Sequence, residues 1–400
     1  KIEDVEKFGR IAGGNFLRWT SEYFAFRNKP VSNHSIARLE NKSGFRHIVH
    51  LNPSGKWMEL VSDPKSKEWA IYTLPLSPPA SGRPALFALT KDERRLVCRG
   101  TDGHLYEHAS ASNSGADGKW TRQNLTEMLG LPKAAADPSV VVANSVPHVV
   151  YVDELGEIRE LWFDGQWRQF PLPAMPRAEG GIVASLDGST LRVIYRSMFG
   201  VPYEQSLNLD SATAKNRSWR TEGVHRLPAM GQPVGLTVNG RRDIVFHVAR
   251  DWPRRQPFVF DWNERRRVPG YFTYEGGRNA LVYAKEIGQR FKNQYNIAHT
   301  TDQLDKGFTL LHDKKNNLHC LVFRSPDGGI RESVLQGEEW AMTNLSELVG
   351  APRAKGSPVG WTNAKNGTRH YLYQGNNSEV HQLSFDGKWT HQAILSKTLK

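Results

Sequence analysis

The chain has 400 residues, of which 38% are hydrophobic, and its 53 Lys and Arg against 41 Asp and Glu give a formal net charge of +12. No stretch reaches the roughly 18 consecutive apolar residues of a transmembrane helix, so the sequence predicts no membrane span. Its first residues, KIEDVEKFGRIAGG, lack the apolar core of a signal peptide.

One pattern recurs along the chain, and residues 148–167, HVVYVDELGEIRELWFDGQW, show it most clearly. An alternating run of β-branched and aromatic residues is followed by a glycine turn and by a second run that carries a glutamate. A second glycine turn leads to a tryptophan at the start of a third run. Alternation with a period of two, interrupted by turns such as Asp164-Gly165, is typical of antiparallel strands in a meander.

Seven copies of the pattern follow one another, and each is preceded by one more short strand. The copies begin at Arg46, Arg95, His148, Arg192, Asp243, His319 and His370. The preceding strands are predicted at 35–40, 84–90, 138–144, 181–187, 233–239, 307–313 and 358–364. Units of four strands and roughly 50 residues cannot bury both of their faces alone, so they stack as blades around a central channel.

The tryptophans that head the last strand of each copy measure the period. They are Trp69, Trp120, Trp167, Trp219, Trp340 and Trp389. Neighbours are 47 to 52 residues apart, except for the 121 residues between Trp219 and Trp340. We therefore predict the fifth blade at about 230–275, with residues 265–272 in place of the tryptophan strand.

The surplus residues after the fifth blade predict an insertion at about 276–304. Its apolar residues have the spacing of one short amphipathic helix; they are Leu281, Ala284, Ile287 and Phe291. Residues 1–32 lie outside the repeats and are predicted to be an arm or a linker. The predicted fold is all-β: a seven-bladed β-propeller of four-stranded antiparallel blades over residues 33–400, with an N-terminal arm and one partly helical insertion.

Motifs of the common catalytic sites do not occur in the sequence: there is no G-x-S-x-G, no H-E-x-x-H and no P-loop. His47, His148, His319 and His370 open the second strand of their blades, so we assign them to the repeat and predict no metal site and no cofactor. Whether the chain is an enzyme is left open, with a binding protein favoured.

The two cysteines, Cys98 and Cys320, fall on equivalent strands four blades apart. Such strands lie farther apart than the Cα distance of about 7 Å that a disulfide tolerates. We predict two buried free thiols.

Eight arginines lie between residues 241 and 267, with Trp252 and Trp262 among them. A basic and aromatic segment of this kind can bind an anionic glycan, a phosphate or a nucleic acid. The alternative is that these residues are solvated loop ends on one blade. Because no helix-turn-helix, RNP signature or zinc spacing accompanies the arginines, we expect no sequence-specific nucleic-acid recognition.

The repeat resembles the fucose-binding β-propeller lectins of fungi and bacteria, and the related seven-bladed bacterial propeller lectins. The resemblance rests on a basic residue that opens strand two, on G-x-I-x-E in strand three and on D-G-x-W before strand four, over residues 33–397. It implies a sugar in a shallow pocket between neighbouring blades, held by an arginine and a glutamate of one blade and an aromatic ring of the next. Arg and Glu form charge-assisted hydrogen bonds to hydroxyls, and the C–H face of a pyranose packs on an aromatic ring.

Carried over to this chain, the resemblance gives one complete triad, Arg95, Glu107 and Trp167, between blades two and three. Two further clefts keep part of the set. Between blades four and five the members are Arg192 and Glu204 with Tyr271 in place of the expected aromatic, and between blades three and four they are His148, Glu160 and Trp219.

Other copies are less complete. His47 stands beside Glu59 and Trp120 between the first two blades, and Cys320 takes the arginine position beside Glu332 and Trp389 in the sixth cleft. The alternative for the whole series is architectural: tryptophan fills the space between blades, and glutamate pairs with the basic residue across a strand.

The predicted function is carbohydrate binding by a lectin-like propeller, with a glycan, neutral or anionic, as the partner. Two alternatives stay open: an enzyme of hydrolase or lyase type that uses the central axial pocket, and a protein-interaction scaffold. Seven Asn-x-Ser/Thr sequons favour a secreted or extracellular protein, with the cytoplasm left open. The oligomeric state is not predicted.

Overall fold

The computed structural model describes residues 36–398, apart from gaps that fall mainly between strands. The longest gaps are 75–79, 111–119, 212–216, 225–231, 249–258, 269–279 and 296–307. From 236 to 243 and from 246 to 307 it describes the course of the strands but not their side chains. The described residues all belong to one compact unit, Asn33–Lys400. The predicted arm, residues 1–32, lies outside the described residues.

The described residues form six four-stranded sheets, one five-stranded sheet and one two-stranded sheet. The seven larger sheets are numbered in chain order, and the strands within each meander are antiparallel. The first holds β1 (Ile36–Glu40), β2 (Arg46–Leu51), β3 (Trp57–Ser62) and β4 (Trp69–Thr73), with β31 (Lys397–Thr398) added parallel to β4. The second holds β5 (Ala80–Ala88), β6 (Arg94–Gly100), β7 (Leu105–Ser110) and β8 (Thr121–Asn124). The third holds β9 (Ser139–Ala143), β10 (Val146–Val152), β11 (Ile158–Phe163) and β12 (Trp167–Pro171).

The remaining sheets repeat this order. The fourth holds β13 (Ala178–Asp187), β14 (Thr190–Ser197), β15 (Pro202–Asn208) and β16 (Arg220–Gly223). The fifth holds β17 (Val234–Val238), β18 (Arg241–Val248), β21 (Ala280–Ile287) and β22 (Arg290–Tyr295). The sixth holds β23 (Phe308–Asp313), β24 (Leu318–Arg324), β25 (Ile330–Gln336) and β26 (Glu339–Asn344), and the seventh β27 (Val359–Thr362), β28 (Arg369–Gln374), β29 (Val380–Phe385) and β30 (Trp389–Ala393).

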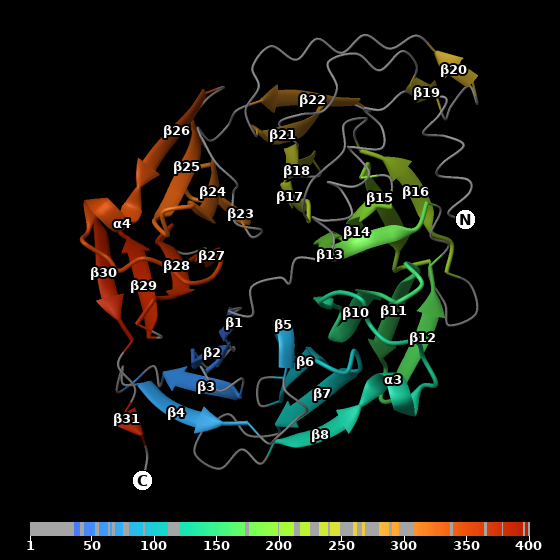
Figure 1. The fold of residues 1–400 in the computed structure, drawn as a ribbon, viewed down its shortest axis with the longest axis horizontal. Helices are drawn as coiled ribbons and strands as arrows, with labels where there is room; N and C mark the ends of the chain where they lie inside the picture. Colours follow the sequence, from blue (N-terminus) through green and yellow to red (C-terminus); the bar gives the residue numbers. More distant parts are fainter. Residues whose placement is uncertain are drawn as a thin grey trace, which may run out of the picture. The chain divides into compact units, whose positions relative to one another are not determined.

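The sheets follow one another around a ring (Figure 1). The first strands of successive sheets contact one another in the order β1, β5, β9, β13, β17, β23 and β27, and β27 contacts β1. The fold is therefore an all-β propeller whose blades are four-stranded antiparallel sheets, as the sequence predicts. All seven predicted first strands are present, and the last sheet is built from consecutive strands only.

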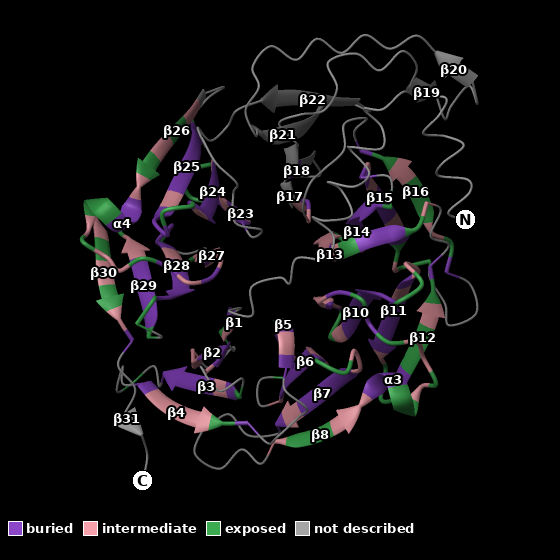
Figure 2. Cartoon of the chain, viewed as in Figure 1, coloured by how far each residue is buried: buried purple, intermediate pink, exposed green. Residues whose placement is uncertain are grey.

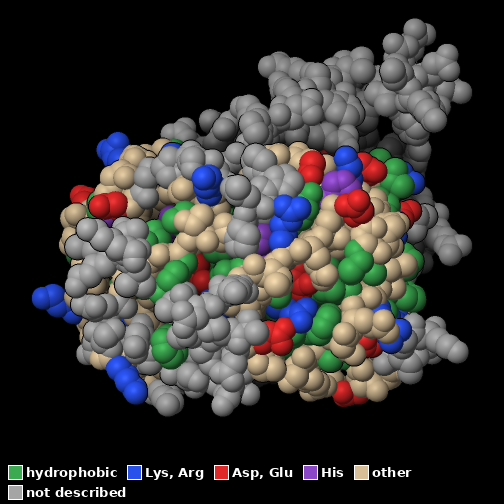
Figure 3. All heavy atoms as spheres, turned by 90° about the horizontal axis from the view of Figure 1, so that it is seen from below, with side chains coloured by type: hydrophobic (Ala, Val, Ile, Leu, Met, Phe, Trp, Pro, Cys, Tyr) green, Lys and Arg blue, Asp and Glu red, His purple; other side chains and the backbone are tan. Residues whose placement is uncertain are grey.

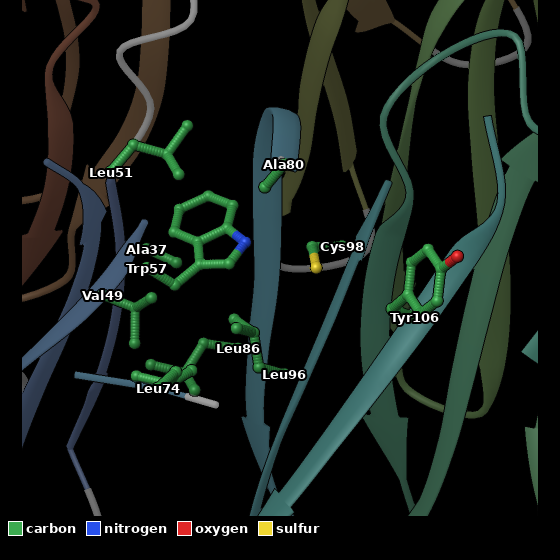
Figure 4. Close-up of a cluster of buried hydrophobic side chains, with 10 residues drawn as sticks. All are labelled: Ala37, Val49, Leu51, Trp57, Leu74, Ala80, Leu86, Leu96, Cys98 and Tyr106. Atoms are coloured by element: carbon green, nitrogen blue, oxygen red, sulfur yellow. The ribbon is translucent and has the colours of Figure 1, made fainter. Parts of the chain in front are cut away.

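Burial follows the position of a strand within its blade. Figure 2 shows buried residues concentrated on middle strands such as β7, β24 and β29. The outer strands β8, β12 and β30 consist mainly of exposed and half-buried residues. The cores lie between neighbouring sheets. Figure 4 shows one of them, where Trp57 of the first sheet packs near Leu96 and Cys98 of the second.

The fifth sheet corrects the prediction for the insertion. The segment predicted as an amphipathic helix forms β21 and β22, which pair with β18 and with each other. The insertion instead lies between β18 and β21, and the pair β19 (Val259–Asp261) and β20 (Arg266–Val268) within it forms a separate two-stranded sheet. The physical reason is that β18 would otherwise present a row of unpaired backbone groups. The cost of leaving them unpaired is larger than the gain from one short amphipathic helix.

Two helical turns are described, and both follow a fourth strand. They are α3 (Leu125–Met128) and α4 (Leu345–Leu348). The side chain of Asn124 caps α3 by accepting a hydrogen bond from the Glu127 backbone, and Asn344 caps α4 in the same way. Each turn opens a loop that bonds to both neighbouring blades, as where the Ala134 amide donates to the Gly103 carbonyl at 2.7 Å.

Candidate functional site

Strand alternation places the first two members of the predicted triad on one face of the second sheet. Arg95 on β6 pairs with Ala109 on β7, and Val97 pairs with Glu107, so all four side chains point the same way. That face meets the third sheet, because Val97 shares a core cluster with Val149 and Trp167. The 12-residue spacing of Arg95 and Glu107 is the span of a hairpin that brings them side by side.

The carboxylate of Glu107 is held by donors from three other strands. The Arg95 Nη1 donates to it at 2.7 Å, the Gln123 Nε2 at 2.5 Å, and the Trp167 indole nitrogen at 2.9 Å. The Glu107 residue is only 3% exposed. A carboxylate fixed in this way keeps a single orientation, and three of its roughly four lone-pair sites accept these hydrogen bonds.

The guanidinium of Arg95 is also fixed from several sides. Its Nε and Nη2 donate to Glu93 at 2.8 and 2.6 Å, and its central carbon lies 4.0 Å from the centre of the Phe163 ring. Glu93 and Glu107 together satisfy three of its nitrogens, and N–H groups remain for a further acceptor.

A pocket of about 300 Å³ opens at this pair. Its lining residues come from β6, β7, β8 and β11: they are Arg95, Glu107, Ala109, Thr121, Arg122, Gln123 and Phe163. This volume is at the lower end of the range of about 300 to 1,000 Å³ for small-molecule sites. The pocket combines fixed hydrogen-bond donors, a carboxylate acceptor, an amide and one aromatic ring.

The ring that lines the pocket is Phe163, which the sequence reasoning missed. Trp167 is 7% exposed and packs edge-on against Phe163, with ring centres 5.5 Å apart. The sequence does contain a signal for Phe163: it stands four residues before Trp167, just as Phe385 stands four residues before Trp389.

The cleft after the fourth sheet keeps its predicted pair. Arg192 Nη1 donates to Glu204 at 2.8 Å, and its Nη2 donates to Asp187 at 2.8 Å. The geometry matches that of Arg95 between Glu93 and Glu107. Tyr271, the predicted aromatic of this cleft, lies outside the described residues.

The cleft after the third sheet contains one residue more than predicted. His148 Nδ1 lies 2.7 Å from Glu160, as the repeat implies. Arg217, in the segment just before β16, also bonds to Glu160, with its Nε at 2.8 Å from the second carboxylate oxygen. Trp219 is half-buried and packs against the core between the third and fourth sheets.

The clefts after the first and sixth sheets also hold an arginine of the following sheet. Arg94 donates to both oxygens of Glu59, at 2.8 and 3.1 Å, and Arg369 donates to both oxygens of Glu332, at 2.9 and 3.4 Å. Burial alone would raise the pKa of Glu59, but hydrogen bonds from His47 and Arg94 hold it below its ordinary value. The Glu59 carboxylate is therefore ionised, and both Glu59 and Arg94 are buried.

The histidines and cysteines that the sequence analysis considered do not form a metal site among the described residues. No three His, Cys, Asp or Glu of the described residues are grouped so that they could hold a metal ion. Cys98 and Cys320 are buried free thiols, as predicted, and burial raises the pKa of Cys98 to about 12.

The described surface shows no sign of a single dominant charge in the view of Figure 3, where Lys and Arg lie among Asp and Glu. The arginines at 250, 254, 255 and 265, with both tryptophans of that segment, lie outside the described residues. Neither described helix has the length and apolar character that a bilayer crossing requires.

No model of a known protein family matches the chain, and no curated protein matches it either. Solved structures are similar to it in fold. BP39L lectin from Burkholderia pseudomallei has a TM-score of 0.66 and 11% identity over 91% of this chain and 99% of its own. AofleA from Arthrobotrys oligospora has a TM-score of 0.50 and 13% identity over 93% of this chain and 89% of its own. At these identities the likeness shows the propeller fold alone.

Proposed function

We propose that this protein is a carbohydrate-binding, lectin-like propeller and that a glycan binds in the pocket between the second and third sheets. The observation that carries the proposal is the Arg95–Glu107 pair, which lines an open pocket with Phe163 at its side. BP39L, the propeller of similar fold from Burkholderia pseudomallei, is a lectin, and this supports the same class. We also propose that each sheet is one blade, seven in all, because the contacts between first strands return from β27 to β1.

Each pocket residue has a distinct role in this proposal. The Arg95 guanidinium donates hydrogen bonds to adjacent sugar hydroxyls, and the Glu107 carboxylate accepts from one of them. Gln123 supplies one donor and one acceptor, while the C–H face of the sugar packs against Phe163. Trp167 is a positioning residue, since it holds Glu107 and supports the Phe163 ring.

The other predicted site residues belong to the same proposal as secondary sites. Arg192 and Glu204, with Tyr271, form one. His148, Glu160 and Trp219 form the other, whose carboxylate is occupied by Arg217. A preference for an anionic glycan and a secreted or extracellular location stay predictions from the sequence; Arg122, exposed in the pocket lining, is the group that would meet an anionic substituent.

The test is calorimetric titration with methyl α-L-fucoside, methyl α-D-mannoside and methyl β-D-galactoside, alongside a glycan array. Glu107→Gln should abolish glycoside binding at the pocket and lower the stoichiometry by one, and Phe163→Ala should weaken binding there by roughly 1 to 3 kcal/mol. Phe385→Ala is the matched control, because Phe385 lies 4.1 Å beneath the guanidinium of Arg369 as Phe163 lies beneath Arg95. Equal losses in the two variants, or an array that is silent for the wild type, would refute the proposed pocket.

A further inference from the structure

Three clefts of the ring are filled by arginines of the protein itself. The carboxylates of Glu59, Glu160 and Glu332 each accept hydrogen bonds from an arginine of the following blade, and these arginines are Arg94 in β6, Arg217 just before β16 and Arg369 in β28. Each of the three is buried, at 3%, 8% and 5% exposure. Each cleft thus has its carboxylate acceptor already satisfied.

The same guanidiniums also cover the aromatic rings of these clefts. Arg94 lies 5.0 Å from the centre of the Trp120 ring, and Arg217 lies 4.4 Å from that of Trp162. Arg95 makes the same two kinds of contact, with Glu107 and Phe163, from its own sheet, but among the described residues no arginine of the third sheet bonds to Glu107. In the three filled clefts, the planar cation that comes from the following blade occupies both features that a sugar would use. Its bond is intramolecular, so a neutral sugar would have to displace a buried ion pair to enter.

The open pocket differs at one position of the repeat. Arg94 directly precedes Arg95, and Arg369 directly precedes His370; at the same place in the third sheet Pro147 precedes His148. Pro147 alternates with Val149 and Tyr151, which face the second sheet in the core cluster that contains Val97. The third sheet therefore presents a proline ring toward the second sheet, where the second and seventh sheets present a guanidinium toward their neighbour.

The fourth sheet has Leu191 at that place, directly before Arg192. Arg217, which comes just before β16, reaches Glu160 instead. The arginine that bonds to the carboxylate can thus come from either of two backbone positions: the second strand of the following blade, or the segment before its fourth strand.

We propose that Arg94, Arg217 and Arg369 act as internal ligands that close three latent glycan sites, and that Pro147 keeps the pocket at Glu107 open. The inference rests on the proposed function, since it assigns the number of sites that a glycan can reach. Replacing a closing arginine should add a site, and placing an arginine at 147 should remove one.

The first experiment opens latent sites. Arg94→Ser and Arg217→Ser are titrated with the three methyl glycosides above, and the stoichiometry should rise by one in each variant relative to the wild type. Arg159→Ser is the matched control, because Arg159 pairs with the buried Asp153 at 2.7 Å and is not among the residues that line the pocket; its stoichiometry should not change. Folding is checked by circular dichroism, since removal of one partner of a buried pair is destabilising.

The second experiment closes the open pocket and does not require an arginine to be removed. Pro147→Arg should weaken glycoside binding by about 100-fold or more, while Pro147→Ala, which lacks a guanidinium, should stay within about threefold of the wild type. A crystal structure of Pro147→Arg should show the new guanidinium on Glu107.

The outcomes separate the two proposals. If the wild type binds and the folded arginine variants keep its stoichiometry, or Pro147→Arg binds as tightly as the wild type, the latent sites are refuted and the proposed function stands. If the wild type does not bind but Arg94→Ser or Arg217→Ser does, the latent sites stand and the open pocket is refuted. If no protein binds, both are refuted. Should the serine variants fail to fold, the Pro147→Arg result decides.

Discussion

The indole nitrogen of Trp167 donates a hydrogen bond of 2.9 Å to the carboxylate of Glu107 across the junction between two sheets. Trp120 makes the corresponding contact with Glu59 one junction earlier, at 3.3 Å. The tryptophan of each of these two blades therefore does two things: it packs between blades and fixes the glutamate of the preceding blade. The two predicted roles of the tryptophan series, architecture and binding, are thus linked by one hydrogen bond.

Replacing Trp167 by phenylalanine should separate packing from hydrogen bonding. Trp167→Phe keeps an aromatic ring in the core but removes the donor to a buried carboxylate, so the free energy of unfolding should fall by about 1 to 3 kcal/mol. Glycoside affinity should fall by about tenfold, because Glu107 loses one of its fixed donors. Urea denaturation and calorimetry measure the two effects.

Trp120→Phe is the control for this substitution. It removes the same donor from Glu59 in a cleft that Arg94 fills, so it should cost similar stability and leave glycoside affinity unchanged. An equal loss of affinity in both variants would argue against binding at Glu107 alone.

The sequence is informative wherever a contact lies within one hairpin. Arg95 and Glu107 are 12 residues apart, and the alternation of β6 and β7 is enough to place them together. The partners of Glu59, Glu160 and Glu332 are 35, 57 and 37 residues away in another sheet. Which side chain crosses that junction depends on packing between blades, and a repeat pattern does not carry this information.

One wrong prediction and one missed residue have a similar origin. The helix predicted for 276–304 rests on local spacing, whereas β21 is a strand because β18 needs a partner. The resemblance gives Trp167 as the stacking ring; its indole is buried, and Phe163, which the sequence pattern did not single out, lines the pocket. Both outcomes are decided by neighbours that are distant in sequence.

Stability should fall in mild acid partly because of His108. Burial, and then the nearby Arg122, lower the pKa of His108 to about 4. The unfolded chain, with a histidine pKa of about 6.5, binds this proton between pH 6.5 and 4 while the folded chain does not, so stability falls as the pH falls through this window. The repeat has leucine at the same place in other blades, as at Leu60, Leu161 and Leu383.

His108→Leu should therefore reduce the acid sensitivity. At pH 5.5 the wild type loses about 1 kcal/mol through this group relative to pH 8, and the variant should not. Urea denaturation of both proteins at the two pH values gives the difference, and other titrating groups such as His370 cancel because they are present in both. If the two proteins lose the same stability between pH 8 and 5.5, His108 is not the sensitive group.

A comparison of Arg95 with Arg192 tests whether the second intact arginine and glutamate pair also binds a glycan. The two arginines have nearly the same bonds: Arg95 lies 2.7 Å from Glu107 and 2.6 Å from Glu93, and Arg192 lies 2.8 Å from Glu204 and from Asp187. Arg95→Gln should weaken glycoside binding in the pocket by roughly 1 to 3 kcal/mol, because it removes a charge-assisted donor. If the cleft at Glu204 is a second site, Arg192→Gln should lower the stoichiometry of calorimetric titration by one and leave the affinity at the pocket unchanged. An unchanged stoichiometry in Arg192→Gln, with the loss confined to Arg95→Gln, would assign glycan binding to the pocket between the second and third sheets alone.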